Sequence, residues 1–240
     1  MFTALARAGV LSTLLCLIAG CVTSQISEQL TSAQLRTSGK SVLVMSVRLV
    51  SRTMSTSCDS VALKRVGDGH EASVMLASHF PSEPFEVSGS VEIDPGTYAV
   101  ALAMCSRPNV RFIVKPADER GMATIRIGPG EVVDGGTLVI IEIFQPTFTE
   151  YFGKSQFSAI VRPHSGRASA ALNPELAGRL ISRPMTAIDP PTPDVLARMC
   201  EFHREQIQSR SGWFYTGSEE APLCQLIGQR SAEAGAGKQR

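Results

Sequence analysis

The residues whose spacing could support metal chemistry lie near the carboxyl end of the chain. Cys200 and His203 are three positions apart, which on a helix places a thiolate and an imidazole on one face. With Cys224 and a distant histidine they could complete a tetrahedral zinc site, the histidine being His70, His79 or His164. The competing interpretation is a disulfide between Cys200 and Cys224. It requires fewer coincident ligands, so the sequence predicts neither a metal site nor a cofactor.

Motifs for phosphate binding and for hydrolysis are incomplete. The run Gly153-Lys154-Ser155 matches the end of a phosphate-binding loop, but the position that needs the first glycine is Phe148. His70 and Glu71 begin like a zinc-protease helix, whereas Val74 occupies the place of the second histidine. No Gly-x-Ser-x-Gly turn marks a nucleophilic serine, and His164 lies in a predicted loop. We therefore assign no catalytic residue.

Charge argues against binding to nucleic acid. The 240-residue chain has 23 basic and 22 acidic residues, a formal net charge of +1. It contains no dense run of Lys or Arg that could neutralise a phosphate backbone. With 43% hydrophobic residues, the chain can bury a core as one domain, or as one domain with a small appendage.

The first 20 residues predict a sorting signal. Arg7 precedes an apolar run over residues 10–19, which is shorter than the roughly 20 residues that a membrane-spanning helix needs. The run Ile18-Ala19-Gly20-Cys21 resembles the lipobox of bacterial lipoproteins, in which an aliphatic and two small residues precede the modified cysteine. The resemblance implies lipid transfer to the Cys21 thiol and cleavage after Gly20. The alternative is an ordinary signal peptide with a coincidental cysteine.

The same resemblance implies a location. An aspartate after the cysteine favours retention at the inner membrane in that family, and Val22 stands there instead. We therefore expect a lipid-anchored protein of the outer membrane that faces the periplasm. Several acyl chains at one residue anchor stably, because each buried methylene contributes about 0.8 kcal/mol. The expected partners are the membrane, through the lipid anchor, and another envelope protein or a glycan, with no nucleic acid.

Four cysteines remain if Cys16 leaves with the signal and Cys21 carries lipid. An even number suits an oxidising compartment. Four cysteines allow three pairings, and each of our two predicted pairs falls within one compositional region of the chain. These pairs are Cys58 with Cys105 and Cys200 with Cys224.

The middle of the chain predicts a β-sandwich. Over residues 41–50, Leu43, Met45, Val47 and Leu49 alternate with other residues and share one face. Turn residues separate this strand from further runs at 61–66, 72–77, 85–93, 97–104, 110–115, 122–127, 137–144 and 157–161. The predicted fold class is mainly β, an antiparallel β-sandwich of Ig-like or transthyretin-like type with a small C-terminal helical element.

One predicted turn carries a second resemblance. Residues 91–100 resemble the hairpin of transthyretin-like envelope β-sandwich modules, with Pro95 and Gly96 between two apolar strands and Tyr98 after them. In a type II turn Pro95 would set the first angle and Gly96 would supply a positive φ. A generic turn of this type between two core strands is the alternative. The resemblance implies no activity.

The flanking segments complete the domain plan. We expect a signal peptide over 1–20 and a lipidated tether over 21–40, with room for a short helix at 26–35. The sandwich domain covers 41–162. Prolines make 163–191 a connection with at most a short helix near 174–181, since proline interrupts a sheet ladder. A helix capped by Thr192 should run to about Ser209 and dock on the sandwich, within a helix and disulfide-loop region at 192–230. A disordered tail follows at 231–240.

One aromatic cluster lies within the predicted Cys200–Cys224 loop, bounded by glycines and formed by Trp213, Phe214 and Tyr215. It could form a contact surface for a protein or glycan, or pack the helix against the sandwich. The sequence thus predicts a non-enzymatic envelope lipoprotein that serves as a binding or assembly module. The alternative is an envelope hydrolase or carbohydrate-processing enzyme, which would need a cleft with two carboxylates a few ångströms apart. The sequence alone does not place Asp94, Glu131 or Asp134 in such a cleft. A structural subunit of a secretion or pilus assembly is a third option.

Overall fold

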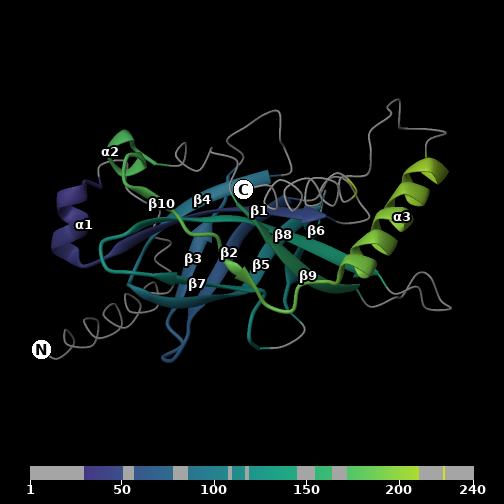
Figure 1. Ribbon diagram of the computed structural model, residues 1–240, viewed down its shortest axis with the longest axis horizontal. Helices are drawn as coiled ribbons and strands as arrows, with labels where there is room; N and C mark the ends of the chain where they lie inside the picture. The colour runs from purple at the N-terminus through teal and green to yellow at the C-terminus, as the bar shows by residue number, and fades with distance from the viewer. Residues whose placement is uncertain are drawn as a thin grey trace, which may run out of the picture.

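Two β-sheets pack face to face in the computed structural model, which describes residues 30–50, 57–77, 86–107, 110–116, 119–144, 155–163, 172–210 and 224 (Figure 1). Sheet A contains β1 (Ser41–Val50), β4 (Glu86–Ile93), β8 (Val132–Phe144), β9 (Ser155–Arg162) and β10 (Leu180–Ser182). Sheet B contains β2 (Ser57–Arg65), β3 (Glu71–Met75), β5 (Gly96–Arg107), β6 (Val110–Val114), β7 (Ala123–Ile127) and β11 (Thr186–Ala187). Among the described ranges, the helices named here are α1 (Ser32–Ser38), α2 (Pro174–Ala177) and α3 (Pro193–Arg210). The predicted mainly-β sandwich with a small helical element is confirmed.

The core lies between the sheets, where side chains of both inner faces meet. Leu43, Met45, Val47 and Leu49 of β1 all belong to it, as the period of two predicts. Every predicted strand is present, with ends shifted by a few residues. The antiparallel prediction holds for most neighbours but is wrong for two, because β8 pairs in parallel with both β1 and β10.

The predicted hairpin over residues 91–100 is wrong. β4 pairs with β1 in sheet A, whereas β5 pairs with β2 in sheet B, so the chain crosses between the sheets here. Gly96 does not have a positive φ. Its lack of a side chain matters for another reason, since a Cβ there would approach Cδ of Arg65 to 2.9 Å. The Tyr98 hydroxyl donates to the Asp94 carbonyl at 2.9 Å, a tyrosine corner that fixes the crossing.

β8 begins five residues before the strand predicted at 137–144, because Asp134, Gly135 and Gly136 form a bulge inside it rather than preceding it. Its pairing with β1 shifts register between Val44 and Ser46. Before the bulge β8 pairs with β10, and after it with β9. Gly136 has φ 78°, and a Cβ on it would lie 2.4 Å from the Arg162 carbonyl oxygen. The bulge therefore lets one strand serve two partners on the same edge.

Residues 180–187 join the two sheets along that edge. The region was predicted as a connection without strands, but β10 pairs with β8 and β11 with β7. Pro184 lies between the two short strands and so interrupts neither ladder. Met185 donates its N–H to the Gly135 carbonyl at 2.8 Å and buries its side chain in the core. On the other edge, Ala77 and Ser88 exchange backbone hydrogen bonds between the sheets.

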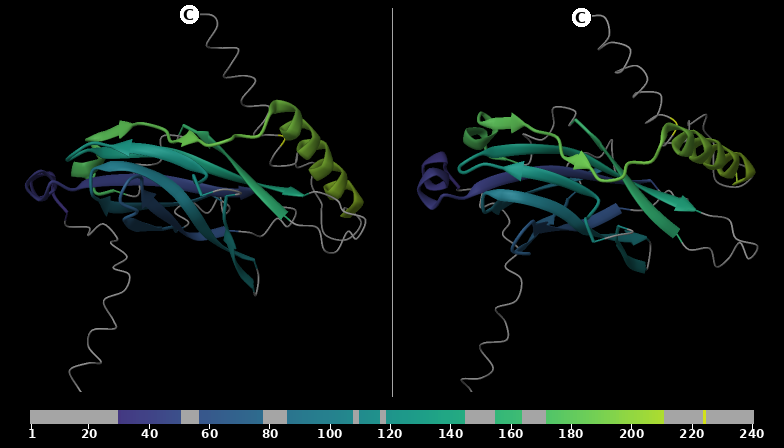
Figure 2. Two further views of the ribbon diagram at one scale, coloured as in Figure 1. Left: turned by 90° about the horizontal axis from the view of Figure 1, so that it is seen from below. Right: turned by 60° about the horizontal axis from the view of Figure 1, so that its bottom comes forward.

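The helices cover the outer face of sheet A at its two ends (Figures 1 and 2). Predicted as tether, residues 32–38 form α1, whose fully buried Leu35 packs against Leu176 of α2 and Val132 of β8. At the opposite end α3 docks through Leu196 and Met199, as predicted for the helix behind Thr192. Residues 30–40 of the predicted tether thus belong to the folded body, because Leu30 and Leu35 complete its small core with Leu176.

We expect Gly136→Ala to destabilise the fold by more than about 2 kcal/mol, because the substitution adds a backbone clash to an unfavourable left-handed conformation. Gly130→Ala is the matched control. Gly130 has a similar φ of 68°, but no atom lies within 4 Å of the Cβ position. Its expected loss is about 1 kcal/mol. Urea denaturation measures both, and equal losses for the two variants would contradict the role assigned to the bulge.

Candidate interaction surface

Both predicted disulfides are present. Cys58 bonds Cys105 across directly opposed positions of β2 and β5, and Cys200 bonds Cys224. The zinc alternative therefore loses both of its thiolates. Among the residues that the structure describes, no three His, Cys, Asp or Glu side chains gather in a way that could hold a metal ion.

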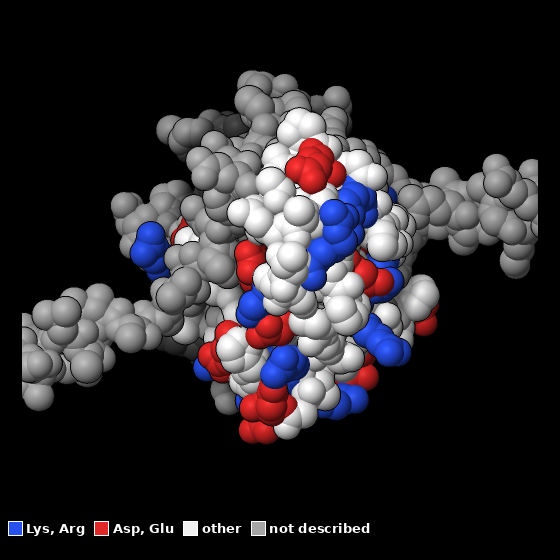
Figure 3. Space-filling view, turned by 90° about the vertical axis from the view of Figure 1, so that its left-hand side faces the viewer, with Lys and Arg blue, Asp and Glu red and all other residues white. Residues whose placement is uncertain are grey.

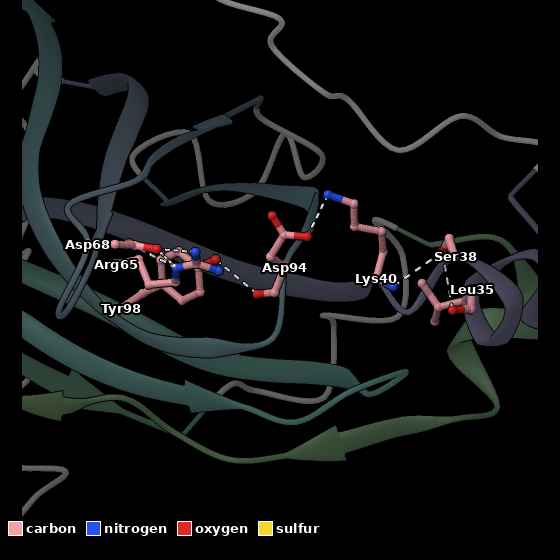
Figure 4. Close-up of polar contacts among 7 residues, drawn as sticks. All are labelled: Leu35, Ser38, Lys40, Arg65, Asp68, Asp94 and Tyr98. Carbon is pink, nitrogen blue, oxygen red and sulfur yellow. Dashed lines mark hydrogen bonds and ion pairs between the residues drawn. The ribbon is translucent and has the colours of Figure 1, made fainter.

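Two of the three carboxylates considered for an enzymatic cleft, Asp94 and Glu131, are held by cationic side chains. Asp94 lies 2.6 Å from the Lys40 ammonium (Figure 4), and the hydrogen bond from Lys40 lowers the pKa of Asp94. Glu131 accepts from Arg183 at 2.6 Å and from the Gly128 N–H at 2.6 Å, and the bond from Arg183 is the main cause that lowers its pKa. A general acid at neutral pH needs the opposite shift. These two side chains fix turns.

A second charged cluster fixes the turn between β2 and β3 (Figure 4). The Arg65 guanidinium donates from Nε to Oδ2 of Asp68 at 2.8 Å. Its Nη2 forms a close ion pair with the same oxygen. This contact raises the pKa of Arg65 and holds that of Asp68 well below its usual range. Asp68 also accepts from the backbone N–H of His70 at 3.0 Å. His70 directly precedes β3, so the residues that begin like a zinc-protease motif form a strand, as the sequence indicated.

Within the described residues, the helices pack on sheet A and the outer face of sheet B carries none. The register aligns four side chains across this outer face. Ser60 of β2 pairs with Met75 on one side and Met104 on the other, and Met104 pairs with Ile113 of β6. We call Met75, Ser60, Met104 and Ile113 the methionine row.

The methionine row leaves substantial apolar surface in water. Met75 is 37% exposed and Ile113 is 49% exposed, while Met104 is half-buried. Arg111 lies at the margin, 3.7 Å from Asp59. Methionine and arginine are enriched at protein interfaces, and the flexible thioether adapts to partner shapes.

A disulfide joins the two central strands that carry the methionine row. The Cys58–Cys105 disulfide lies on the inner side of β2 and β5, two residues from Ser60 and one from Met104. Both cysteines are almost fully buried in the core. A surface on cross-linked central strands loses little conformational freedom when a partner binds.

Sequence reasoning did not identify this row. The sequence feature that could have identified it is the run Ala99–Met104, in which every residue is apolar. A strand with one solvent-exposed face would instead alternate apolar and polar residues. The predicted contact residues Trp213, Phe214 and Tyr215 and the lipidation site Cys21 lie outside the described residues. No helix in the described ranges is long and apolar enough to cross a bilayer.

Comparison with known proteins identifies no family for this chain. No protein-family model and no curated protein sequence matches the chain. One similar solved structure is a Bacteroides fragilis protein provisionally described as a cell adhesion protein, with 9% identity and a TM-score of 0.31. The match covers 52% of this chain and 45% of that one, so the chain spans under half of its length. A likeness at this level carries no conclusion about fold or function.

We expect Glu131→Gln to lower the free energy of unfolding by about 1 kcal/mol at pH 7. Because the folded-state pKa of Glu131 is lowered, its contribution is complete above the unfolded pKa of about 4.3 and is lost as the pH falls below it. The difference between the variant and the original chain should therefore shrink in acid. Chemical denaturation at pH 7 and at about pH 3 measures this. Exposed Glu119, changed to Gln, is the control, and an equal loss in both variants would refute the role of the Arg183 pair.

Proposed function

We propose that this chain is a lipid-anchored protein of the bacterial cell envelope that acts, without catalysis, as a binding or assembly module. The lipobox-like run ending at Cys21 supports lipidation, and Val22 supports delivery to the outer membrane with the body in the periplasm. Leu30, nine residues after that cysteine, already belongs to the folded body, which suits a lipid-anchored module.

The observation that carries the binding role is the unequal covering of the two sheets. Sheet A buries its apolar outer side chains under α1, α2 and α3. Sheet B keeps Met75 and Ile113 partly exposed on its outer face. Exposed apolar side chains that gather on one face mark sites of protein contact.

The chemistry of the row favours a protein over a glycan as partner. Two methionines and an isoleucine offer apolar contact area, whereas sugar recognition relies on hydrogen-bonding groups and aromatic rings. Trp213, Phe214 and Tyr215 form a second contact region of the proposal, within the segment that the Cys200–Cys224 bond closes.

Site-specific photo-crosslinking in cells tests the proposal. A photoreactive residue in place of Ile113 should give a discrete crosslinked protein adduct in the membrane fraction. Ile181 is the matched control, because it is an isoleucine of similar exposure, 43%, but belongs to β10 of sheet A. An adduct at Ile113 and none at Ile181 is expected. Equal adducts at both positions, or none at Ile113, would refute a contact role for sheet B.

A further inference from the structure

The described chain is fixed to the body from its first residue. The Leu30 carbonyl accepts from the Asn173 side-chain amide at 2.8 Å. Two residues later the Ser32 N–H donates to Oε1 of Glu175 at 2.9 Å, and Leu35 is fully buried. Any anchor preceding Leu30 therefore acts at the α1–α2 end of the sandwich.

The segment between the proposed anchor and this fixed point is short. Nine peptide units separate Cys21 from Leu30. Whatever its conformation, a chain of this length reaches at most about 30 Å, since each residue extends by no more than about 3.6 Å. Leu30 must then lie within that distance of the membrane surface if Cys21 carries lipid.

The sandwich is longer than this reach. Leu30 packs in the same cluster as Val132, the first residue of β8, and β8 has 13 residues. At about 3.3 Å per residue this strand alone spans about 40 Å. If the opposite end faced the membrane, Leu30 would lie beyond the reach of the segment. The short tether therefore excludes the inverted orientation.

Resting on the proposed lipidation of Cys21, we infer that the α1–α2 end is held nearer to the lipid headgroups of the anchoring membrane than the opposite end. β5 begins beside the Lys40–Asp94 pair at the α1–α2 end, so Met104 lies toward the other end. α3 docks at that end too, beside Val50, the last residue of β1. The methionine row and the Cys200–Cys224 bond are thus presented to partners in the periplasm.

The charged side chains of the α1–α2 end do not determine the orientation of the protein on the membrane. Basic and acidic side chains are interspersed over the α1–α2 end, with neither sign prevailing (Figure 3). Binding to an anionic lipid surface depends on clusters of Lys and Arg. The length of the tether is therefore the orienting constraint, and the orientation should be the same on neutral and anionic vesicles.

Energy transfer from labelled protein to the membrane tests this. The acylated mature protein, which begins at Cys21, carries one added cysteine, Ala33→Cys on α1 or Val110→Cys on β6, both exposed positions. Each is labelled with a donor and reconstituted in phosphatidylcholine vesicles, or phosphatidylcholine–phosphatidylglycerol vesicles, with an acceptor headgroup. Transfer from residue 33 should exceed transfer from residue 110 by at least about twofold, because about 40 Å of sandwich separates the two ends.

Two further measurements make the outcome decisive. About 20 Gly/Ser residues inserted after Thr23 should reduce the difference, because the longer segment reaches past the sandwich. Equal transfer from the two labels, or a difference that the insertion leaves unchanged, overturns the inference. Intact mass of the same preparation separates the causes. An unacylated Cys21 overturns the proposed anchoring together with the inference, whereas an acylated Cys21 with equal transfer overturns the orientation alone.

Discussion

The constraint on which the arrangement depends is the burial of Leu35 and Leu176 against the start of sheet A. These side chains bring α1 and α2, which are distant in sequence, into one small core. Truncating a buried leucine typically costs about 2–5 kcal/mol, more than a seven-residue helix could recover from its own hydrogen bonds. The contact thus determines where the chain enters the body, and so where an anchor would pull.

The two sheets then take different roles. Sheet A is covered at both ends and carries the bulge at Gly136, which lets β8 pair with β9 and β10 on one edge. Sheet B is reinforced by the Cys58–Cys105 bond and keeps an apolar outer row. A stiff face with a partly exposed row of methionine and isoleucine side chains suits reversible contact with another protein. Asp94 and Glu131 are tied to a lysine and an arginine, which suits a structural role rather than acid–base chemistry.

Local pattern predicted the strands well, because alternation in β1 is set by the residues themselves. It predicted both disulfides because each pair lies within one region of the chain. It failed where distant residues decide. The chain crosses between the sheets after Asp94 because β5 pairs with β2, which is distant in sequence. Likewise, β10 forms because Leu180 pairs with Val132, which lies 48 residues earlier in the chain. The exposure of Ile113 likewise depends on where the helices dock.

Hydrogen exchange at the Leu35 amide tests most directly whether the chain is fixed to the body before β1. This N–H donates to the Thr31 carbonyl at 3.0 Å, and the Val42 N–H in β1 donates to the Glu131 carbonyl at 2.8 Å. If α1 is part of the core, the two amides should exchange with protection within about tenfold of each other. Exchange of the Leu35 amide at the rate of an unstructured peptide, with Val42 still protected, would contradict this.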